Sequence, residues 1–312
     1  MKKNSKGRRL FSQAFICAVL LCAFSVFSPL YTANAQQSES PATAFFINEI
    51  SLLKERITTH EQNEAQALRA LEAAKKALDL AIKKNDAAAR DISIQAIALS
   101  EEVLSTVKRQ KARDINRLKA LQEASKWKDA GRGAGVAGVI KGEVLKKSKG
   151  GSARFDGKSP LLEGDTIETG RDGFAELMLP DYSYVSAGAD TALEILKLDA
   201  EQLQSTYNII KGKVYILRAC LKHALEHRGA CWFTHYRTHG AAVAVRGTEF
   251  SMEHGPEDAS VTVFEGEVEV TEKDTNRVVS AGGMQQLIIG KDGSVQGPVP
   301  VRADLIHRWW ED

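Results

Sequence analysis

The spacing of apolar residues changes once along the chain. Between residues 44 and 128 apolar side chains recur with a seven-residue period, whereas from residue 138 onward they alternate with polar ones. A seven-residue period is typical of packed helices, and alternation is typical of half-buried strands. The two periods therefore predict an α+β multidomain chain, with a helical part followed by an all-β part.

The helical part, residues 44–128, consists of two arms of about 40 residues on either side of one polar break. It is rich in strong helix formers and contains neither Pro nor Gly. In the break, Asn85 can adopt a left-handed cap and Asp86 can begin the next helix. Equal arms predict an antiparallel helical hairpin or coiled coil, with each arm roughly 60 Å long. A long helix that dimerises with a second copy fits the same spacing.

Each arm has one polar gap in its apolar register. The gaps fall at His60 and Glu64 in the first arm, and at Lys111 and Asp114 in the second. Folding the chain about Asn85 brings residue 60 opposite residue 111, because both lie about 25 residues from the turn. We interpret the coinciding gaps as a polar layer that fixes the register of the helices.

Residues 129–137 form a glycine-rich segment between the two parts. A G-x-G-x-x-G pattern runs from Gly133 to Gly138. This pattern binds a dinucleotide when a strand precedes it and a helix follows, so that phosphates meet a helix N-terminus. Here the order is reversed, and we expect a flexible linker instead of a nucleotide site.

The β part, residues 138–296, repeats one short pattern, a strand-like run with a glycine between charged residues. Turn signals such as Asp156-Gly157 and Asp292-Gly293 separate the runs. Similar strands that recur in one domain predict an all-β fold, either a sandwich or a solenoid-like stack. The three copies of the pattern are Val139–Val144, Ile209–Val214 and Val263–Val268.

Four further motifs follow one another along the β part: G-D-x-I-x-T-G, R-G-T-x-F, E-G-x-V and A-G. Their order and composition resemble the FecR domain family over residues 138–296, about half of the chain. The resemblance implies structural roles for these positions and a partner surface, but no reaction and no cofactor. The motif residues are Gly164, Asp165, Ile167, Thr169, Gly170, Arg246, Gly247, Thr248, Phe250, Glu265, Gly266, Val268, Ala281 and Gly282.

Two positions depart from the family pattern. Asp181-Tyr182 stands where the family usually has Asp-Gly, and tyrosine makes a tight turn less easily than glycine. His239 follows Thr238 where the family often has proline.

Regulators of this family combine a cytoplasmic anti-sigma segment and a membrane helix with a periplasmic part that receives a signal from an outer-membrane receptor. Only a short basic stretch precedes the first apolar run here, so we expect no direct anti-sigma activity.

Residues 1–35 carry the three parts of a secretory signal peptide. A basic start precedes an apolar run from Phe15 to Phe27, and Ala33-Asn34-Ala35 supplies a cleavage site. Cleavage would begin the mature protein at a linker, residues 36–43, and leave it in the periplasm. The alternative is a retained membrane anchor, although the apolar run is short for a membrane-spanning helix.

Removal of this segment changes the net charge from +2 to −3. Five of the 42 basic residues and none of the 40 acidic ones lie in the segment, which leaves 37 basic against 40 acidic residues. A weakly acidic protein without a basic stripe does not neutralise phosphates, so we expect no nucleic-acid partner.

The sequence shows no catalytic motif, and we expect the protein not to be an enzyme. Glu249 and Glu265 are carboxylates that could pair as in glycoside hydrolases, but the acidic residues of the β part alternate as solvent-facing positions do.

Two cysteines remain in the mature chain, Cys220 and Cys231, with ten residues between them. In an oxidising compartment we expect them to form a disulfide that closes a loop. The alternative is a zinc or copper site that adds His223 and His227, which are spaced to share one face of a helical turn.

The C-terminal tail, residues 297–312, carries the pair Trp309-Trp310. These rings either anchor a partner or pack back on the β part.

Together the features predict a non-enzymatic periplasmic protein that acts as a protein-interaction or sensory module of the cell envelope. Its expected partner is an envelope protein such as a receptor or transporter. The alternatives are a structural scaffold or homo-oligomer assembled through the helical part, and a metal- or carbohydrate-binding envelope protein.

Overall fold

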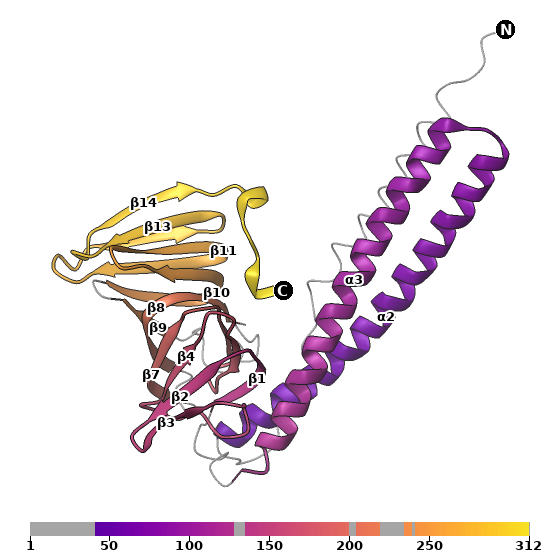
Figure 1. Ribbon diagram of the computed structural model, residues 1–312. Helices are drawn as coiled ribbons and strands as arrows, with labels where there is room; N and C mark the ends of the chain where they lie inside the picture. Colours follow the sequence, from indigo (N-terminus) through magenta and orange to yellow (C-terminus); the bar gives the residue numbers. More distant parts are fainter. Residues whose placement is uncertain (1–40, 128–134, 200–203, 219–233, 239–240, 312) are drawn as a thin grey trace. The chain divides into compact units, whose positions relative to one another are not determined.

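The computed structural model describes residues 41–127, 135–199, 204–218, 234–238 and 241–311 (Figure 1). Two long helices come first in this part of the chain, and fourteen strands follow. The protein therefore has the α+β architecture that the two periods predict.

The described chain divides into two compact units. One unit is residues 52–115, the distal part of the two helices. The other contains the first residues of the first helix up to Ser51, and everything from Asn116 onward. Both ends of the helical part thus belong to the same unit as the strands.

Helix α2 spans Pro41–Lys83 and helix α3 spans Ala87–Ala124. Asn85 in the turn between them has a φ of 49°, as predicted for a left-handed cap. The Asp86 carboxylate accepts a hydrogen bond from the backbone N–H of Ala89 at 3.1 Å, which caps α3. In the described part of the chain, no helix is long and apolar enough to cross a membrane.

Within the hairpin of residues 52–115, buried side chains recur every seven residues on both helices. Most of them are small, which lets two helices approach closely and leaves larger apolar side chains on the flanks. The buried positions on α2 follow the register predicted from the sequence. Buried apolar or hydroxyl residues are Leu53, Ala67, Ala74 and Ala81 on α2, and Ser93, Ser100 and Val107 on α3.

The two predicted polar gaps meet inside the hairpin. Asp114 lies 3.1 Å from His60 Nε2 and accepts a hydrogen bond from Arg56 at 3.0 Å, and Lys111 donates to Glu64 at 2.9 Å. Residue 60 therefore lies opposite residue 114 and not residue 111. The difference arises because the hairpin folds about the start of α3, at the midpoint between His60 and Asp114, and not about the centre of the polar break.

The strands extend from Val136 to Pro300, where we predicted a β part over residues 138–296. Two short 3₁₀ turns follow them. The strands are β1 (Val136–Lys141), β2 (Val144–Ser148), β3 (Gly151–Arg154), β4 (Thr166–Thr169), β5 (Phe174–Met178), β6 (Ser183–Ala187), β7 (Ala192–Asp199), β8 (Gln204–Arg218), β9 (Thr234–Arg237), β10 (Ala241–His254), β11 (Asp258–Glu272), β12 (Val278–Gly282), β13 (Gln285–Gly290) and β14 (Val295–Pro300).

Hydrogen bonds join all fourteen strands into one sheet. Its main path runs β14-β13-β11-β10-β9-β8-β7-β4-β2-β3, and a branch joins β1, β5 and β6 to β8. Nearly all pairings are antiparallel, and β8 with β9 is parallel. Long strands change partners along their length: residues 204–211 of β8 pair with β7, whereas residues 214–218 pair with β6.

A glycine lies at three places where the chain changes from one partner strand to another. These three glycines belong to the short pattern that occurs three times in the sequence. Gly142 between β1 and β2, Gly212 in β8 and Gly266 in β11 have φ values of 62°, 88° and 86°. Only glycine adopts such a conformation without strain. A Cβ on Gly212 would also lie 2.5 Å from the backbone of Thr191. The repeated pattern therefore marks the positions, between β1 and β2 and within β8 and β11, where the backbone needs the positive φ of glycine.

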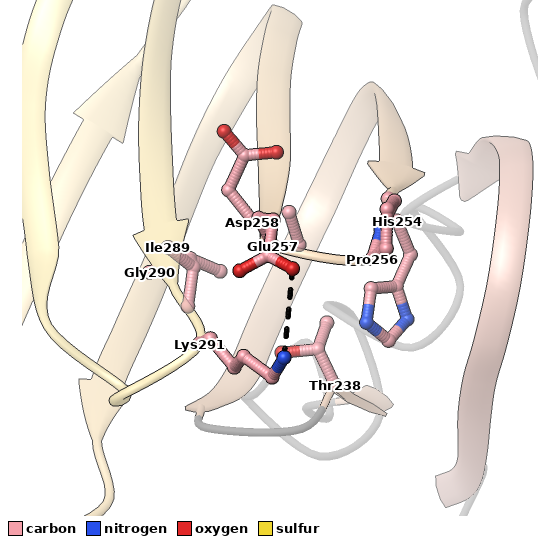
Figure 2. A pocket seen from close by; sticks show the side chains of 10 residues that line it. Thr238, His254, Pro256, Glu257, Asp258, Ile289, Gly290 and Lys291 are labelled. Carbon is pink, nitrogen blue, oxygen red and sulfur yellow. Dashed lines mark ion pairs between the residues drawn. The ribbon is translucent and has the colours of Figure 1, made fainter.

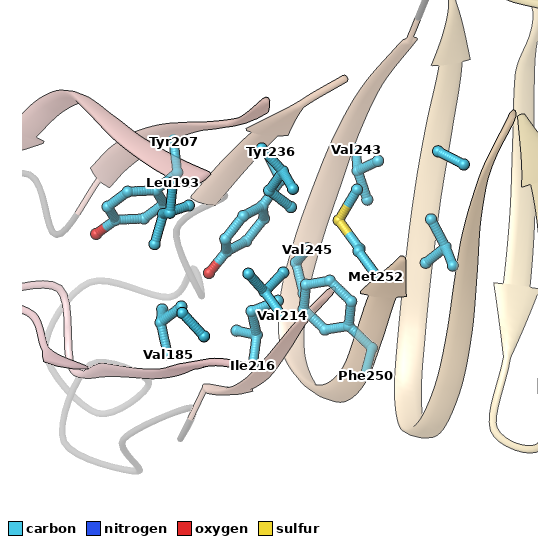
Figure 3. Close-up of a cluster of buried hydrophobic side chains, with 14 of the residues drawn as sticks. Val185, Leu193, Tyr207, Val214, Ile216, Tyr236, Val243, Val245, Phe250 and Met252 are labelled. Carbon is cyan, nitrogen blue, oxygen red and sulfur yellow. The ribbon is translucent and has the colours of Figure 1, made fainter. Parts of the chain in front are cut away.

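The core of the β part takes buried side chains from strands between β1 and β14, and Figure 3 shows a section of it around β6 to β10. The rings of Tyr207 and Tyr236 are 5.3 Å apart at its centre, and Phe250 packs edge-on against Tyr236 at 5.4 Å. Along β8 and β10 these side chains alternate with more exposed ones, as the sequence predicts for a half-buried sheet, whereas β6 is buried at all five positions.

Candidate functional site

The early motif residues build turns and do not form an exposed site. Gly164 has a φ of 84°, and buried Asp165 accepts a hydrogen bond from the backbone N–H of Leu162 at 2.9 Å. The buried Thr169 hydroxyl bridges backbone groups of the turn between β6 and β7. The backbone N–H of Gly170 donates to a carbonyl of the β1–β2 turn at 2.8 Å. Each residue thus stabilises a chain reversal.

The late motif lies on β10 and β11, where their ladder contains a bulge. Arg246 pairs with Glu267 and Glu249 with Glu265, so β10 has one more residue than β11 between these pairs. A bulge redirects the side chains beside it. Glu249 and Glu265 therefore lie side by side on neighbouring strands.

Two residues of the same motif face inward and stabilise the bulge. Thr248 is buried, and its hydroxyl donates to a backbone carbonyl of β11 at 2.9 Å. Phe250 is fully buried in the core. Gly247 lies within β10, between the paired positions. In this motif, Thr248 and Phe250 face the core and stabilise the fold, whereas Glu249 and Glu265 lie on the outer face of the sheet.

The C-terminal tail covers side chains next to this bulge. It contains the 3₁₀ turns η3 (Ala303–Leu305) and η4 (Trp309–Glu311), and it runs back from β14 (Figure 1). The Trp310 ring stacks on Tyr215 of β8 at 4.3 Å with an interplanar angle of 7°, and lies 5.2 Å from the ring of Phe264. Trp310 is only 3% exposed. Of the two alternatives for the tryptophans, the structure shows packing back on the β part.

The carboxylate beside this aromatic stack is partly withdrawn from water. Burial raises the pKa of Glu249, and the neighbouring Glu265 and Glu311 carboxylates add to the rise. The Tyr215 hydroxyl, which donates to Glu249 at 2.9 Å, and the Arg308 guanidinium oppose it. The surface therefore combines flat aromatic rings with carboxylates, a combination that suits an aromatic side chain next to a cation.

A second set of contacts joins the ends of the helices to β5 and β6, and it centres on one of the departures from the family pattern. Tyr182, in the turn where the family has glycine, has a φ of 63°. The turn nevertheless forms, and its backbone N–H donates to the carbonyl of Leu179 at 2.9 Å. The Tyr182 ring packs edge-on against Phe45 of α2 at 5.3 Å, and its hydroxyl accepts a hydrogen bond from Asn48 at 3.3 Å. Tyrosine therefore keeps the turn and adds a contact to α2.

A buried ion pair lies near this turn. Arg117 of α3 donates two hydrogen bonds to Glu176 of β5, at 2.7 and 2.9 Å, and both side chains are buried. The Arg117 guanidinium lies 4.4 Å from the ring of Tyr184, whose hydroxyl donates to Glu49 of α2. No pattern in the sequence predicted these four residues. The only signal nearby was the replacement of glycine by Tyr182.

The pocket shown in Figure 2 is too small for a substrate. It lies between the β10–β11 and β13–β14 turns and has a volume of about 10 Å³, room for about one water molecule. Two of its polar groups have local partners, since His254 Nδ1 lies 2.6 Å from the carbonyl oxygen of Ile209 and Lys291 lies 3.6 Å from Glu257, whereas the buried hydroxyl of Thr238 has none among the described residues. We therefore assign no ligand to it.

The predicted disulfide and its metal-site alternative lie outside the described residues, as do Cys220, His223, His227 and Cys231 themselves. The signal peptide of residues 1–35 also lies outside them. Within the ranges that the structure describes, no group of three or more His, Cys, Asp or Glu side chains is arranged to hold a metal ion.

Residues 165–269 match the family model described as FecR protein. Two crystal structures, at 1.65 and 2.50 Å, of a proposed anti-sigma factor from Parabacteroides distasonis ATCC 8503 resemble the chain with 20% sequence identity and a TM-score of 0.34. The similar region covers 42% of this chain and 57% of the other protein, so the chain matches little more than half the length of that relative. No curated protein sequence matches the chain.

The matched range begins at the buried Asp165 and ends on β11. It therefore contains the β10–β11 bulge, the turn at Tyr182, and Tyr215, on which Trp310 stacks. Of the motifs that carried the resemblance in the sequence, the first begins one residue before the matched range and the next two lie within it, whereas Ala281-Gly282 lies beyond it. The chain carries a FecR domain in residues 165–269.

Proposed function

We propose that this protein is a non-enzymatic signalling or interaction module of the cell envelope, exported to the periplasm, whose FecR domain binds a protein partner. The match of residues 165–269 to the FecR family carries this proposal. The exposed Glu265 carboxylate beside the half-buried rings of Tyr215 and Phe264 supports it, because such surfaces suit protein recognition better than catalysis.

The contacts around Tyr182 give the partner a route to the helices. Glu49 and Arg117, near the ends of α2 and α3, are bound to Tyr184 and Glu176 on neighbouring strands. A partner that displaces β5 or β6 therefore acts directly on both helix ends. We propose that the helical part reports or stabilises the bound state of the domain.

Site-specific photo-crosslinking in the native envelope tests the function. We would place a photoreactive amino acid at the exposed positions Leu196, Ile210 and Glu265 of the FecR domain, with matched positions Leu80 and Ile92 on the helices as controls. A crosslink from the domain to one identified receptor or transporter supports the proposal. Domain positions that crosslink to no protein, under conditions where the protein is exported and folded, would contradict it.

A structural scaffold is the second candidate, and the flanks of the hairpin favour it. Large apolar side chains are exposed on both helices of residues 52–115, where a single hairpin leaves them in water. In the same experiment, crosslinks from Leu80 and Ile92 to a second copy of the chain, without domain crosslinks, would support the scaffold. The exposed apolar residues are Leu68, Leu80, Ile82, Ile92 and Ile94.

A further inference from the structure

Both tryptophans of the C-terminal tail pack against the FecR domain. Trp310 fills the place above Tyr215 and Phe264. Trp309 lies over Gly188, where a Cβ would come within 2.9 Å of its ring, and the Lys213 ammonium lies 4.9 Å from the ring centre. The absence of a side chain at Gly188 therefore creates the space that Trp309 occupies.

The part of the tail beyond β14, residues 301–312, can leave this surface without opening the strand ladder. Its last backbone hydrogen bond to a strand-connecting turn is from Val301 to Met284, at 2.9 Å. Farther along, the backbone N–H groups of Ile306 and Glu311 close turns inside the tail. The ion pair of Arg308 with Glu311, at 3.0 Å, is also internal to the tail. The packing of the two tryptophan rings therefore helps to hold the tail on the domain, and the charge of Arg308 beside Glu249 adds to it.

The surface under the tail has a definite chemistry. Tyr215 and Phe264 offer aromatic faces, and Glu249 and Glu265 offer carboxylates beside them. In the tail, an arginine two residues before the buried tryptophan brings a cation toward Glu249. Stacking on the rings together with charge complementarity would select a segment with an aromatic residue and a nearby cation.

We propose that this face is the partner-binding surface of the FecR domain, and that the tail occupies it in place of a partner segment that carries an aromatic side chain next to Arg or Lys. The proposal deepens the proposed function and rests on it, since it names the surface and the chemistry of the protein partner. The tail acts as an internal competitor that the partner displaces.

A labelled synthetic peptide with the sequence of residues 302–312 tests the proposal on the purified full-length mature protein. Trp310→Ala empties the place above Tyr215, so this variant should bind the peptide at least about tenfold more tightly than the wild type, whose own tail competes at an effective concentration near the millimolar range. A peptide with Ala in place of both tryptophans should not bind. A peptide with Ala in place of Arg308 should bind more weakly, and its affinity should depend less on salt.

A second variant keeps the test independent of any damage from Trp310→Ala. Gly188→Ala directs a methyl group at the Trp309 ring, so it should loosen the tail. A peptide with Ala in place of Trp309 lacks that ring, and it should bind this variant several fold more tightly than it binds the wild type. Gly150→Ala is the matched control, because a Cβ there meets nothing within 4 Å. It should bind like the wild type.

Equal affinities for all the proteins, or no binding to either Trp310→Ala or Gly188→Ala up to about 1 mM peptide, would overturn the proposal and make the tail a fixed part of the fold. A concentration-dependent dimer of the wild type that the peptide dissociates would also overturn it, because the tail would then exchange between copies. Neither outcome depends on the envelope crosslinking, so a failure here is distinct from a failure of the proposed function.

Discussion

Replacement of Tyr182 by glycine, which restores the usual residue of the family, should destabilise this protein. Tyr182 has a φ of 63°, and the left-handed conformation costs a residue with a side chain about 1–2 kcal/mol. Glycine removes that strain. It also makes the unfolded chain more flexible, which offsets about 0.5–1 kcal/mol of the gain.

The loss of packing is larger than the relief of strain. The Tyr182 side chain is only 7% exposed and contacts Phe45 and Asn48 of α2. Truncation of a buried aromatic side chain typically costs about 3–5 kcal/mol. The free energy of unfolding should therefore fall by about 2–4 kcal/mol, which lowers the Tm by roughly 4–16 °C for a protein of this size.

Urea denaturation followed by circular dichroism measures the change. Asn276→Gly is the matched control, because Asn276 also has a positive φ, of 54°, but is exposed on a turn. Its effect should stay within about 0.5 kcal/mol. A double-mutant cycle with Phe45→Ala should give a coupling of about 1 kcal/mol between the two rings. A Tyr182→Gly protein as stable as the wild type, or additive effects in the cycle, would refute the reasoning.

Three further changes test the polar groups, each by denaturation of the purified protein. Glu176→Ala removes the carboxylate that accepts two hydrogen bonds from the buried Arg117 and should cost about 3–5 kcal/mol, whereas replacing the pair together by Leu and Met should cost little; equal losses would contradict a buried pair. The raised pKa of Glu249 means that the folded state binds a proton more tightly than the unfolded state. The stability that this group contributes is therefore present below its ordinary pKa of about 4.3 and is lost as the pH rises through the pKa of the folded state. Glu249→Gln should remove that decline and stabilise the protein near pH 7, and a pH profile of stability that is unchanged in the variant would contradict this prediction. Asp114→Ala should destabilise the hairpin. Leu at both His60 and Asp114 should keep the stability of the hairpin but permit other helix registers and oligomers, which light scattering would detect. An unchanged oligomeric state in this double variant would argue against a register role.

Local patterns in the sequence were sufficient for the elements and their ends. The absence of Pro and Gly predicted the two helices, and Asn85 and Asp86 predicted the turn between them. The repeated charge-glycine pattern marked Gly212 and Gly266, because a bend with positive φ needs glycine wherever it occurs. The motifs also indicated the FecR domain. All these signals lie within a few residues of the feature they specify.

The contacts between elements were decided only by the tertiary structure. Arg117 and Glu176 are 59 residues apart, and Glu49 and Tyr184 are 135 apart, so no spacing rule connects them. Their pairing depends on how closely two helix ends and two strands pack. The sequence showed that Tyr182 was unusual for its turn, but the reason is the ring of Phe45 on α2. Likewise, Trp309 and Trp310 were compatible with a partner contact or an internal one, and the choice came from the space above Gly188 and Tyr215, which exists only when the sheet is complete.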